Sequence, residues 1–197
     1  MTPTPVPSDT TTRHQREARL QQRAFVVWFT GLPCSGKTTL ATALQQRLSE
    51  QGLLAYVLDG DELRRGLNAD LGYGPDDRRE NIRRAAEASK LLVANGVVTL
   101  SCFITPSEAL RLLARQIIGD ADFIEVFVKC PVEECERRDV KGLYRKARAG
   151  DVKDFTGVSA PYEEPMHADV VVDTVATSVD RCVGELFDIV AARAVYK

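Results

Sequence analysis

Residues 31–38 read Gly-Leu-Pro-Cys-Ser-Gly-Lys-Thr and match the phosphate-binding pattern G-x-x-x-x-G-K-[ST]. The apolar segment FVVWFT precedes the loop and TTLATALQQRLSE follows it, which predicts the strand and helix that the pattern requires. Backbone N–H groups of such a loop point at phosphate oxygens, and the helix N-terminus adds positive charge. Lys37 should reach the β- and γ-phosphates, and the Thr38 hydroxyl should bind Mg²⁺. We therefore expect an ATP site made by Gly31, Leu32, Pro33, Cys34, Ser35, Gly36, Lys37, Thr38 and Thr39.

Two carboxylates, Asp59 and Asp61, stand on either side of Gly60 at the end of the next apolar segment. Ligands gather at this end of the strands in open α/β sheets. A carboxylate there binds magnesium through water or accepts the proton of an attacking hydroxyl. We therefore expect Asp59 or Asp61 to hold the metal through water; the alternative is a surface turn with solvated charges.

Arginines are frequent in the stretch that follows, LRRGLNADLGYGPDDRRENIRR, which contains Arg64, Arg78 and Asn81. The planar guanidinium binds phosphate or sulfate through two parallel hydrogen bonds, which lysine does not do. We interpret these residues as the part that selects an anionic acceptor. The alternative is an ordinary charged helix surface.

Basic residues also dominate 137–153, where seven basic side chains accompany two acidic ones. Kinases on this kind of scaffold close a cationic lid over the phosphates, so that a hydroxyl attacks rather than water. A cationic lid is our interpretation. A solvated basic helix and an RNA-binding patch are the alternatives, and the second has only Tyr144 and Phe155 nearby as stacking platforms.

The remaining pattern alternates strand-length apolar runs with segments of helical spacing. Strands are predicted at 25–30, 54–59, 97–103, 123–129 and 169–173. Helices are predicted at 37–51, 76–95, 106–118, 131–138 and 178–193. Continuously apolar strands joined by crossover helices indicate a doubly wound α/β domain, with a parallel sheet covered on both faces.

Composition limits the domain count and the class of partner. The chain of 197 residues is 44% hydrophobic and 27% charged with a net charge of -2, as in one soluble domain. We expect a flexible N-terminal extension at 1–23, with a disordered tail over 1–12 and a short basic helix over 13–23, and one domain at 24–197. No nucleic-acid or membrane partner is expected, and with no signal peptide or membrane span visible, a cytoplasmic location is predicted.

The five cysteines form no C-x-x-C pair, which argues against a zinc site or a disulfide framework. Cys34 lies among the donors of the phosphate loop, where positive potential favours a thiolate. We therefore hypothesise that Cys34 is sensitive to oxidation. The alternative is that it is only a small residue that fits the loop.

With these motifs the sequence resembles the adenylyl-sulfate kinase (APS kinase) family, over about three quarters of the chain. The matching stretches are GLPCSGKTT, LDGDELRRGLNADLGY, DDRRENIRR, SCFITP, CPVEECERRDVKGLYRKARAG and DFTGVSAPYEEP. The resemblance implies a three-layer P-loop NTPase fold, with a five-stranded, mainly parallel sheet, helices on both faces and a basic lid at about 137–160. It also implies transfer of the ATP γ-phosphate to the 3'-hydroxyl of adenosine 5'-phosphosulfate (APS), giving PAPS for sulfate assimilation. Magnesium as cofactor, a homodimer and a functional link to ATP sulfurylase are implied as well.

By position, the resemblance implies that Asp61 orients or deprotonates the acceptor hydroxyl, and that Lys37 and Lys141 act on the phosphates. Tyr73 and Phe155 would enclose the acceptor adenine. The implied acceptor contacts are Asp61, Arg64, Tyr73, Arg78, Asn81, Ile82, Ile104, Thr105, Lys141, Leu143, Phe155 and Thr156. Thr177, in the stretch that begins at Thr174, would border the ATP adenine.

The chain departs from the family pattern at two places. Pro33, Cys34 and Ser35 replace the common S-G-[AS], which keeps both motif glycines. Thr105 replaces a serine described as phosphorylatable, which leaves any phosphoserine intermediate in doubt, although direct transfer needs none. Two alternatives to APS kinase activity stay open: another small-molecule kinase, and an ATP-binding regulatory module without turnover. A GTPase is disfavoured, because no N-K-x-D guanine motif is present.

Overall fold

The structure, a computed structural model, describes residues 11–196. Five strands form one sheet in the order β2-β3-β1-β4-β5, and every pair of neighbours is parallel. The bounds are β1 (Val26–Thr30), β2 (Ala55–Asp59), β3 (Val98–Cys102), β4 (Phe123–Lys129) and β5 (Val170–Asp173). The predicted five-stranded α/β sheet is confirmed, and all five strands lie within one residue of their predicted bounds.

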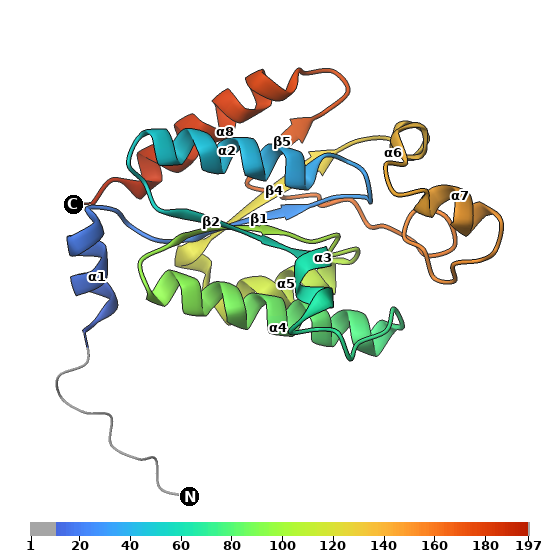
Figure 1. Ribbon diagram of the computed structural model, residues 1–197, viewed down its shortest axis with the longest axis horizontal. Coiled ribbons are helices and arrows are strands. Elements are labelled where there is room, and N and C mark those ends of the chain that lie inside the picture. Colours follow the sequence, from blue (N-terminus) through green and yellow to red (C-terminus); the bar gives the residue numbers. More distant parts are fainter. Residues whose placement is uncertain (1–10, 197) are drawn as a thin grey trace, which may run out of the picture.

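Helices cover both faces of the sheet, with α2 and α8 on one side and α4 and α5 on the other (Figure 1). The helices are α1 (Arg13–Leu20), α2 (Lys37–Glu50), α3 (Gly60–Arg65), α4 (Pro75–Ala94), α5 (Glu108–Ile118), α6 (Val132–Arg138), α7 (Leu143–Arg148) and α8 (Val179–Ala194), with a short 3₁₀ turn η1 (Asp120–Asp122). Three layers result, as expected. The sequence did not predict α3 and α7, because six-residue helices are too short to show a helical period.

The central strand β1 is apolar up to its last residue, because both of its faces pack against the helices. Val27 and Phe29 pack into the cluster under α2 and α8, whereas Val26 and Trp28 pack into the cluster under α4 and α5. All five residues of β1 are buried, since a central parallel strand has no solvated face. Burying each large apolar side chain contributes about 1.5–3 kcal/mol.

The N-terminal residues that the structure describes pack against the domain. Thr12 caps α1 through a reciprocal pair of bonds with Gln15, Arg13 pairs with Asp122, and the fully buried Gln22 bonds the backbone at Leu54 and Gly96. The short helix was predicted, but this packing differs from the flexible extension expected over 1–23. Polar composition indicated weak packing, yet these side chains complete backbone hydrogen bonds of the domain.

Residues 1–10, most of the predicted disordered tail, lie outside the described residues. Within residues 11–196, no helix has the length and apolar character needed to cross a membrane.

Candidate active site

The phosphate loop joins the end of β1 to the start of α2, and its glycines are needed by its geometry. Gly31 and Gly36 have φ values of +152° and +107°, which side chains rarely adopt. A Cβ at Gly31 would lie 2.6 Å from the carbonyl oxygen of Val128 on β4. The loop is therefore held against the sheet at a distance that only glycine allows.

Lys37, the first residue of α2, is buried inside this loop. Its Nζ donates to the carbonyl oxygens of Gly31 and Leu32 at 2.9 and 2.6 Å. Burial lowers the pKa of Lys37 to about 8, because an ammonium ion loses hydration there. A charged amine held on a phosphate loop is suited to bind the phosphates of ATP.

Thr38, Asp59 and Asp61 meet at the carboxyl ends of β1 and β2. The Thr38 hydroxyl donates to Asp59 Oδ2 at 2.7 Å, and Asp59 Oδ1 accepts the N–H of Asp61 at 2.8 Å, which caps α3. Hydroxyl and carboxylate oxygens are the ligands that Mg²⁺ prefers, with water and substrate phosphates completing the shell. Among residues 11–196 no group of three His, Cys, Asp or Glu side chains could hold a metal without such help. The donor set therefore fits Mg²⁺ carried by a nucleotide.

The lid reaches this edge through Lys141, which lies between α6 and α7 and pairs with the carboxylate of Asp61. The hydrogen bond to Asp61 raises the pKa of Lys141. Both side chains are more than half exposed, so the pair adds only about 0–1 kcal/mol to stability. The pair brings together two residues that were predicted to be catalytic and that are 80 positions apart in the sequence.

On the acceptor side, Arg64 and Tyr73 form a stacked pair. The Arg64 guanidinium lies 4.2 Å from the centre of the Tyr73 ring, and its Nη1 donates to the carbonyls of Leu71 and Gly72 at 3.1 and 3.0 Å. Tyr73 is 61% exposed, so one face of its ring remains open for a planar ligand.

Arg78 connects this region with the end of the lid. It donates to the carbonyl of Tyr73 at 2.8 Å, to the Thr156 hydroxyl at 2.7 Å and to the carbonyl of Asp154. Phe155, between these two lid contacts, packs edge-on against Tyr144 with ring centres 4.9 Å apart. Arg78 thus holds the segments carrying the two expected adenine-stacking rings in one assembly.

Several predicted acceptor contacts are less open than expected. Ile82 is 3% exposed in the core under α4, and Asn81 accepts a bond from Asn68 at 2.9 Å inside the protein. Thr105 is 1% exposed, and its hydroxyl accepts the indole N–H of Trp28 at 2.9 Å. These side chains are covered by other parts of the chain, in contrast to the predicted pocket lining. Helical and loop positions adjacent in sequence to a site can face the core instead.

Other predicted contacts are half-buried near the site. Leu143 packs at the edge of the small apolar cluster around Tyr144. Ile104 accepts through its carbonyl from the Thr30 hydroxyl at 2.7 Å and from the N–H of Gly31 at 3.4 Å. Thr177 donates its N–H to Asp173 beside the end of β5. Leu143, Ile104 and Thr177 are far apart in the sequence. They lie toward one edge of the sheet because each follows the carboxyl end of a parallel strand.

Arg138 at the end of α6 is a residue that sequence reasoning missed. It donates to the carbonyls of Ser35 and Thr174 at 3.3 and 2.9 Å, and the Thr174 hydroxyl donates to the same Ser35 carbonyl at 2.9 Å. Arg138 therefore braces the phosphate loop. In the sequence it is one basic residue among seven, and nothing distinguishes it.

The charge excess of 137–153 is smaller in the structure than its sequence suggests. Arg137 and Arg138 pair with Glu134, and Arg148 pairs with Glu136. Both acids precede the counted window. Glu134 pairs with its arginines at helical spacing, whereas Glu136 on α6 pairs with an arginine on α7. Ion pairs within the protein therefore offset part of the positive charge that the sequence shows in 137–153.

The family model of adenylylsulphate kinase matches residues 23–173, more than half of the chain. The chain belongs to the adenylyl-sulfate kinase family. The adenylyl-sulfate kinase of Bacteroides fragilis is 50% identical over 182 residues, which cover 92% of this chain and 90% of that protein. The probable adenylyl-sulfate kinase of Halalkalibacterium halodurans is 51% identical over 175 residues, 89% of this chain and 87% of that protein.

Solved structures agree with this family assignment. The Mycobacterium tuberculosis APS kinase in complex with AMPPNP and APS has a TM-score of 0.83 and 46% identity, covering 86% of this chain and 98% of that one. A hexameric APS kinase from Thiobacillus denitrificans has a TM-score of 0.62 and 28% identity, covering 90% of this chain and 30% of that one. A gluconokinase from Sinorhizobium meliloti, at 16% identity and a TM-score of 0.56, shares the fold alone. The predicted P-loop kinase fold and APS kinase family are confirmed.

Proposed function

We propose that this chain transfers the γ-phosphoryl group of ATP to the 3'-hydroxyl of APS, giving ADP and PAPS. The contact of Lys141 with Asp61, beside the Thr38 and Asp59 pair, is the observation that carries the proposal within this family. The start of α2, α3 and the helices α6 and α7 of the expected lid lie toward the same end of the sheet (Figure 1), which supports roles for Asp61 as base and Lys141 as lid cation. Asp61 takes the proton of the 3'-hydroxyl as its oxygen attacks phosphorus, and the bond to the ADP oxygen breaks.

Lys37, Lys141 and the loop N–H groups stabilise the charge that spreads over the transferring group. Lys37 can exchange its bonds to Gly31 and Leu32 for bonds to phosphate oxygens without leaving the loop. Lys141 can release Asp61 when the phosphates arrive, which frees the carboxylate to act as the base. Bound Mg²⁺, held by Thr38 and through water by Asp59 or Asp61, would neutralise phosphate charge during the transfer.

The acceptor lies, in this proposal, between α3, the start of α4 and the lid. The open face of Tyr73 stacks on the adenine, and Phe155 closes the other side once the lid moves. Arg64 and Arg78 supply guanidinium donors for the phosphosulfate. Ile104, which is half-buried, borders the same space, and Asn81 supports it from the interior through its bond with Asn68.

The assembly and the cellular context are further parts of the proposal. We propose a homodimer, supported by the existence of an oligomeric relative, and static light scattering should give about twice the chain mass of 21.7 kDa. An enzyme that makes APS from ATP and sulfate, an ATP sulfurylase, must supply the acceptor. The five cysteines are all unpaired, which supports a reducing compartment such as the cytoplasm.

The activity is tested by coupling ADP release to an optical signal in the presence of ATP, Mg²⁺ and APS, with PAPS identified by mass spectrometry. Asp61→Asn should lower the rate by about 10² to 10⁴-fold, since the base is lost. Asp188→Asn, at an exposed position on α8, is the matched control and should retain the rate. ADP release that gluconate or a nucleoside drives as well as APS would contradict the proposal, as would ATP binding without transfer.

A further inference from the structure

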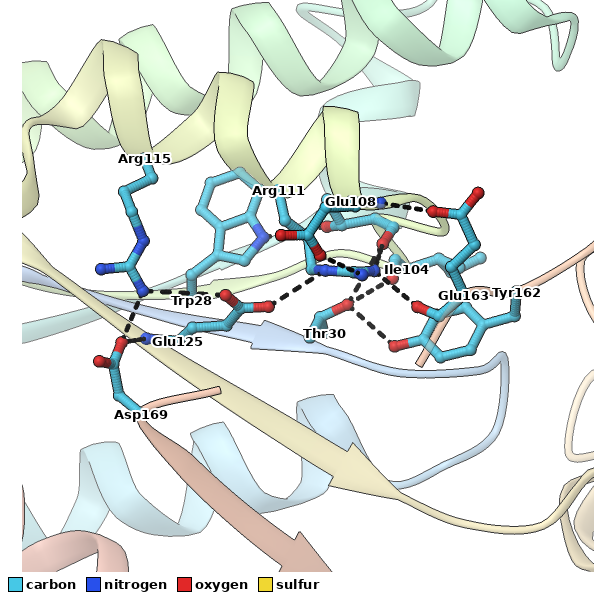
Figure 2. A network of polar contacts seen from close by, with 11 residues as sticks. Trp28, Thr30, Ile104, Glu108, Arg111, Arg115, Glu125, Tyr162, Glu163 and Asp169 are labelled. Carbon is cyan, nitrogen blue, oxygen red and sulfur yellow. Dashed lines mark hydrogen bonds and ion pairs between the residues drawn. The ribbon is translucent and has the colours of Figure 1, made fainter. Parts of the chain in front are cut away.

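A buried polar cluster lies behind the acceptor side of the site, between the loop after β3, the first turns of α5 and the segment that follows the lid (Figure 2). Arg111 on α5 is its centre and is only 3% exposed. Its Nη1 donates to the carbonyl oxygens of Thr105 and Glu163, at 3.2 and 2.8 Å. One guanidinium nitrogen therefore binds two loops that are 58 residues apart in sequence.

The first of these loops is held in a conformation that its residue type disfavours. Thr105 has a φ of +45°, which a β-branched side chain rarely adopts. Such backbone is strained and persists only where the surroundings impose it. Here the surroundings are Arg111 on its carbonyl and Trp28 on its hydroxyl. Figure 2 shows Trp28 and Arg111 converging on this loop.

The second loop, at 162–163, is fastened to the first by its own backbone and side chains. The N–H of Glu163 donates to the carbonyl of Pro106 at 2.8 Å, and its carboxylate accepts the N–H of Glu108 at 2.8 Å. The Tyr162 ring stacks on Phe127 of β4. This segment is where the chain leaves the expected lid of 137–160, so these bonds hold the exit of the lid to the loop after β3.

The same cluster extends to the phosphate loop through Thr30, the last residue of β1. The Thr30 hydroxyl lies 2.7 Å from the carbonyl of Ile104 and 3.1 Å from the Tyr162 hydroxyl. Its single proton is used on the carbonyl, which can only accept, so the Tyr162 hydroxyl donates to Thr30. Since Gly31 follows Thr30 and donates to the same carbonyl at 3.4 Å, the contacts continue into the nucleotide site.

Charge explains why an arginine is tolerated at this depth. The Arg111 Nε lies 3.3 Å from Glu125 Oε1, an ion pair without hydrogen-bond alignment. Arg115, one turn further along α5, also approaches Glu125 and binds Asp120 and Asp169. Burial raises the pKa of Glu125 and the two arginines oppose this. Neutralising Arg111 would leave a buried carboxylate short of a partner, so a charge-preserving variant is the useful one.

We propose that Arg111 is a positioning residue for phosphoryl transfer, acting by clamping the acceptor-side loop at Ile104 and Thr105 to the lid-exit segment at Tyr162 and Glu163. The clamp fixes one wall of the acceptor site relative to the segment from which the lid closes, so that wall and lid enclose the acceptor in one geometry. This inference rests on the proposed function, and it adds a residue that does not touch either substrate. We expect Arg111 to affect kcat/KM for the acceptor and not the affinity for ATP.

The test compares Arg111→Lys with Arg115→Lys. Both keep the charge beside Glu125, but a lysine at 111 cannot bind two carbonyls and a carboxylate from the directions that a planar guanidinium uses. For Arg111→Lys we expect kcat/KM for APS to fall about tenfold or more, with the Kd for ATP changed less than twofold. Arg115→Lys, which loses contacts to neither loop, should keep both constants within about twofold.

Tyr162→Phe provides the second, milder variant, because it removes one hydroxyl and leaves the ring stacked on Phe127. It should lower kcat/KM for APS in the same sense, and combined with Arg111→Lys it should add less than its separate effect. Tyr56→Phe, at an exposed tyrosine on β2, is the matched control. If Arg111→Lys fails to fold, the Tyr162→Phe result decides.

Distinct outcomes separate this inference from the proposed function. Wild-type protein that forms no PAPS overturns the proposed function. Wild-type protein that forms PAPS, with Arg111→Lys or Tyr162→Phe indistinguishable from its control, overturns the clamp. A loss shared equally by ATP binding and acceptor use overturns it too, because that pattern indicates only a general structural role.

Discussion

The ammonium group of Lys37 has a pKa well below its ordinary value. It is enclosed by its own loop and donates to the carbonyls of Gly31 and Leu32. Burial holds its pKa at about 8, against an ordinary value of 10.5. The folded protein without nucleotide therefore prefers a neutral amine over a window in which the unfolded chain is still charged.

This perturbation predicts that ATP binding takes up protons above pH 8. Phosphate favours the charged amine and raises its pKa, so affinity for ATP should fall as pH rises from about 8 towards 10.5. For folding, the cost of the buried charge is present below pH 8 and is relieved over the same window. Calorimetry at pH 8.5 in two buffers of different ionisation enthalpy measures the uptake. Lys37→Arg is the control, and equal heats for wild type in both buffers would contradict the prediction.

The Thr105 hydroxyl is placed where phosphorylation is disfavoured. It is 1% exposed and already accepts the indole N–H of Trp28. We expect no phosphate on Thr105 after incubation with ATP and Mg²⁺, as measured by peptide mass spectrometry on wild type and on Thr105→Val as control. A phosphate on Thr105 that disappears on addition of APS would contradict direct phosphoryl transfer from ATP to APS. It would support a covalent phosphothreonine intermediate.

At the scale of the elements, α1 and the turn after it close the amino-terminal edge of the sheet. Gln22 is fully buried and bonds the carbonyls of Leu54 and Gly96 and the N–H of Leu54, between 2.7 and 2.9 Å. It joins the strand entrances of β2 and β3 to the N-terminal segment. This edge is opposite to the catalytic one, so its role is stability.

Gln22→Ala should therefore destabilise the fold without changing catalysis. Unpaired backbone groups at Leu54 and Gly96 cost about 2–3 kcal/mol in the free energy of unfolding. Urea denaturation followed by circular dichroism measures the loss, and kcat under folded conditions should stay the same. Gln46→Ala on the exposed face of α2 is the control. A drop in kcat with unchanged stability would show that α1 acts on the site.

At the scale of the whole molecule, ligand binding should stabilise the entire domain, because the site is formed by loops from several strands. ATP with Mg²⁺ at 100 times its Kd adds about 2.7 kcal/mol. For a chain of this size that raises the melting temperature by about 5–10 °C. Differential scanning fluorimetry measures the shift, and Lys37→Ala should lose most of it. An equal shift in both proteins would place the nucleotide elsewhere.

Periodicity and motif predicted most of the architecture. Runs such as FVVWFT form strands that are buried on both faces, and such strands need apolar residues at nearly every position. The residue types alone therefore predict them. The phosphate loop could be recognised because its glycines are imposed by local backbone geometry. By contrast, α3 and α7 are too short to show a helical period in the sequence. The packing of the segment around α1 depends on polar contacts such as those of Gln22, which a pattern of hydrophobic residues does not reveal.

In the candidate site, too, some features could be predicted from the sequence and others could not. Lys37, Thr38 and Asp61 were predicted, because their chemistry and their place at strand ends are local properties. The burial of Ile82 and Thr105 was not predicted, since the direction of a side chain at the edge of a core depends on packing partners.

The sequence by itself determined the family, the sheet and the phosphate loop, and it supplied the candidates for the reacting groups, because those features depend on neighbours in the chain. Only the tertiary structure decided that Lys141 meets Asp61, that Arg138 braces Ser35 and that Arg111 joins the two loops. Each of these contacts spans more of the chain than a motif does or uses a residue type that is common on surfaces. Their partners become adjacent only because the parallel strands end at one edge of the sheet.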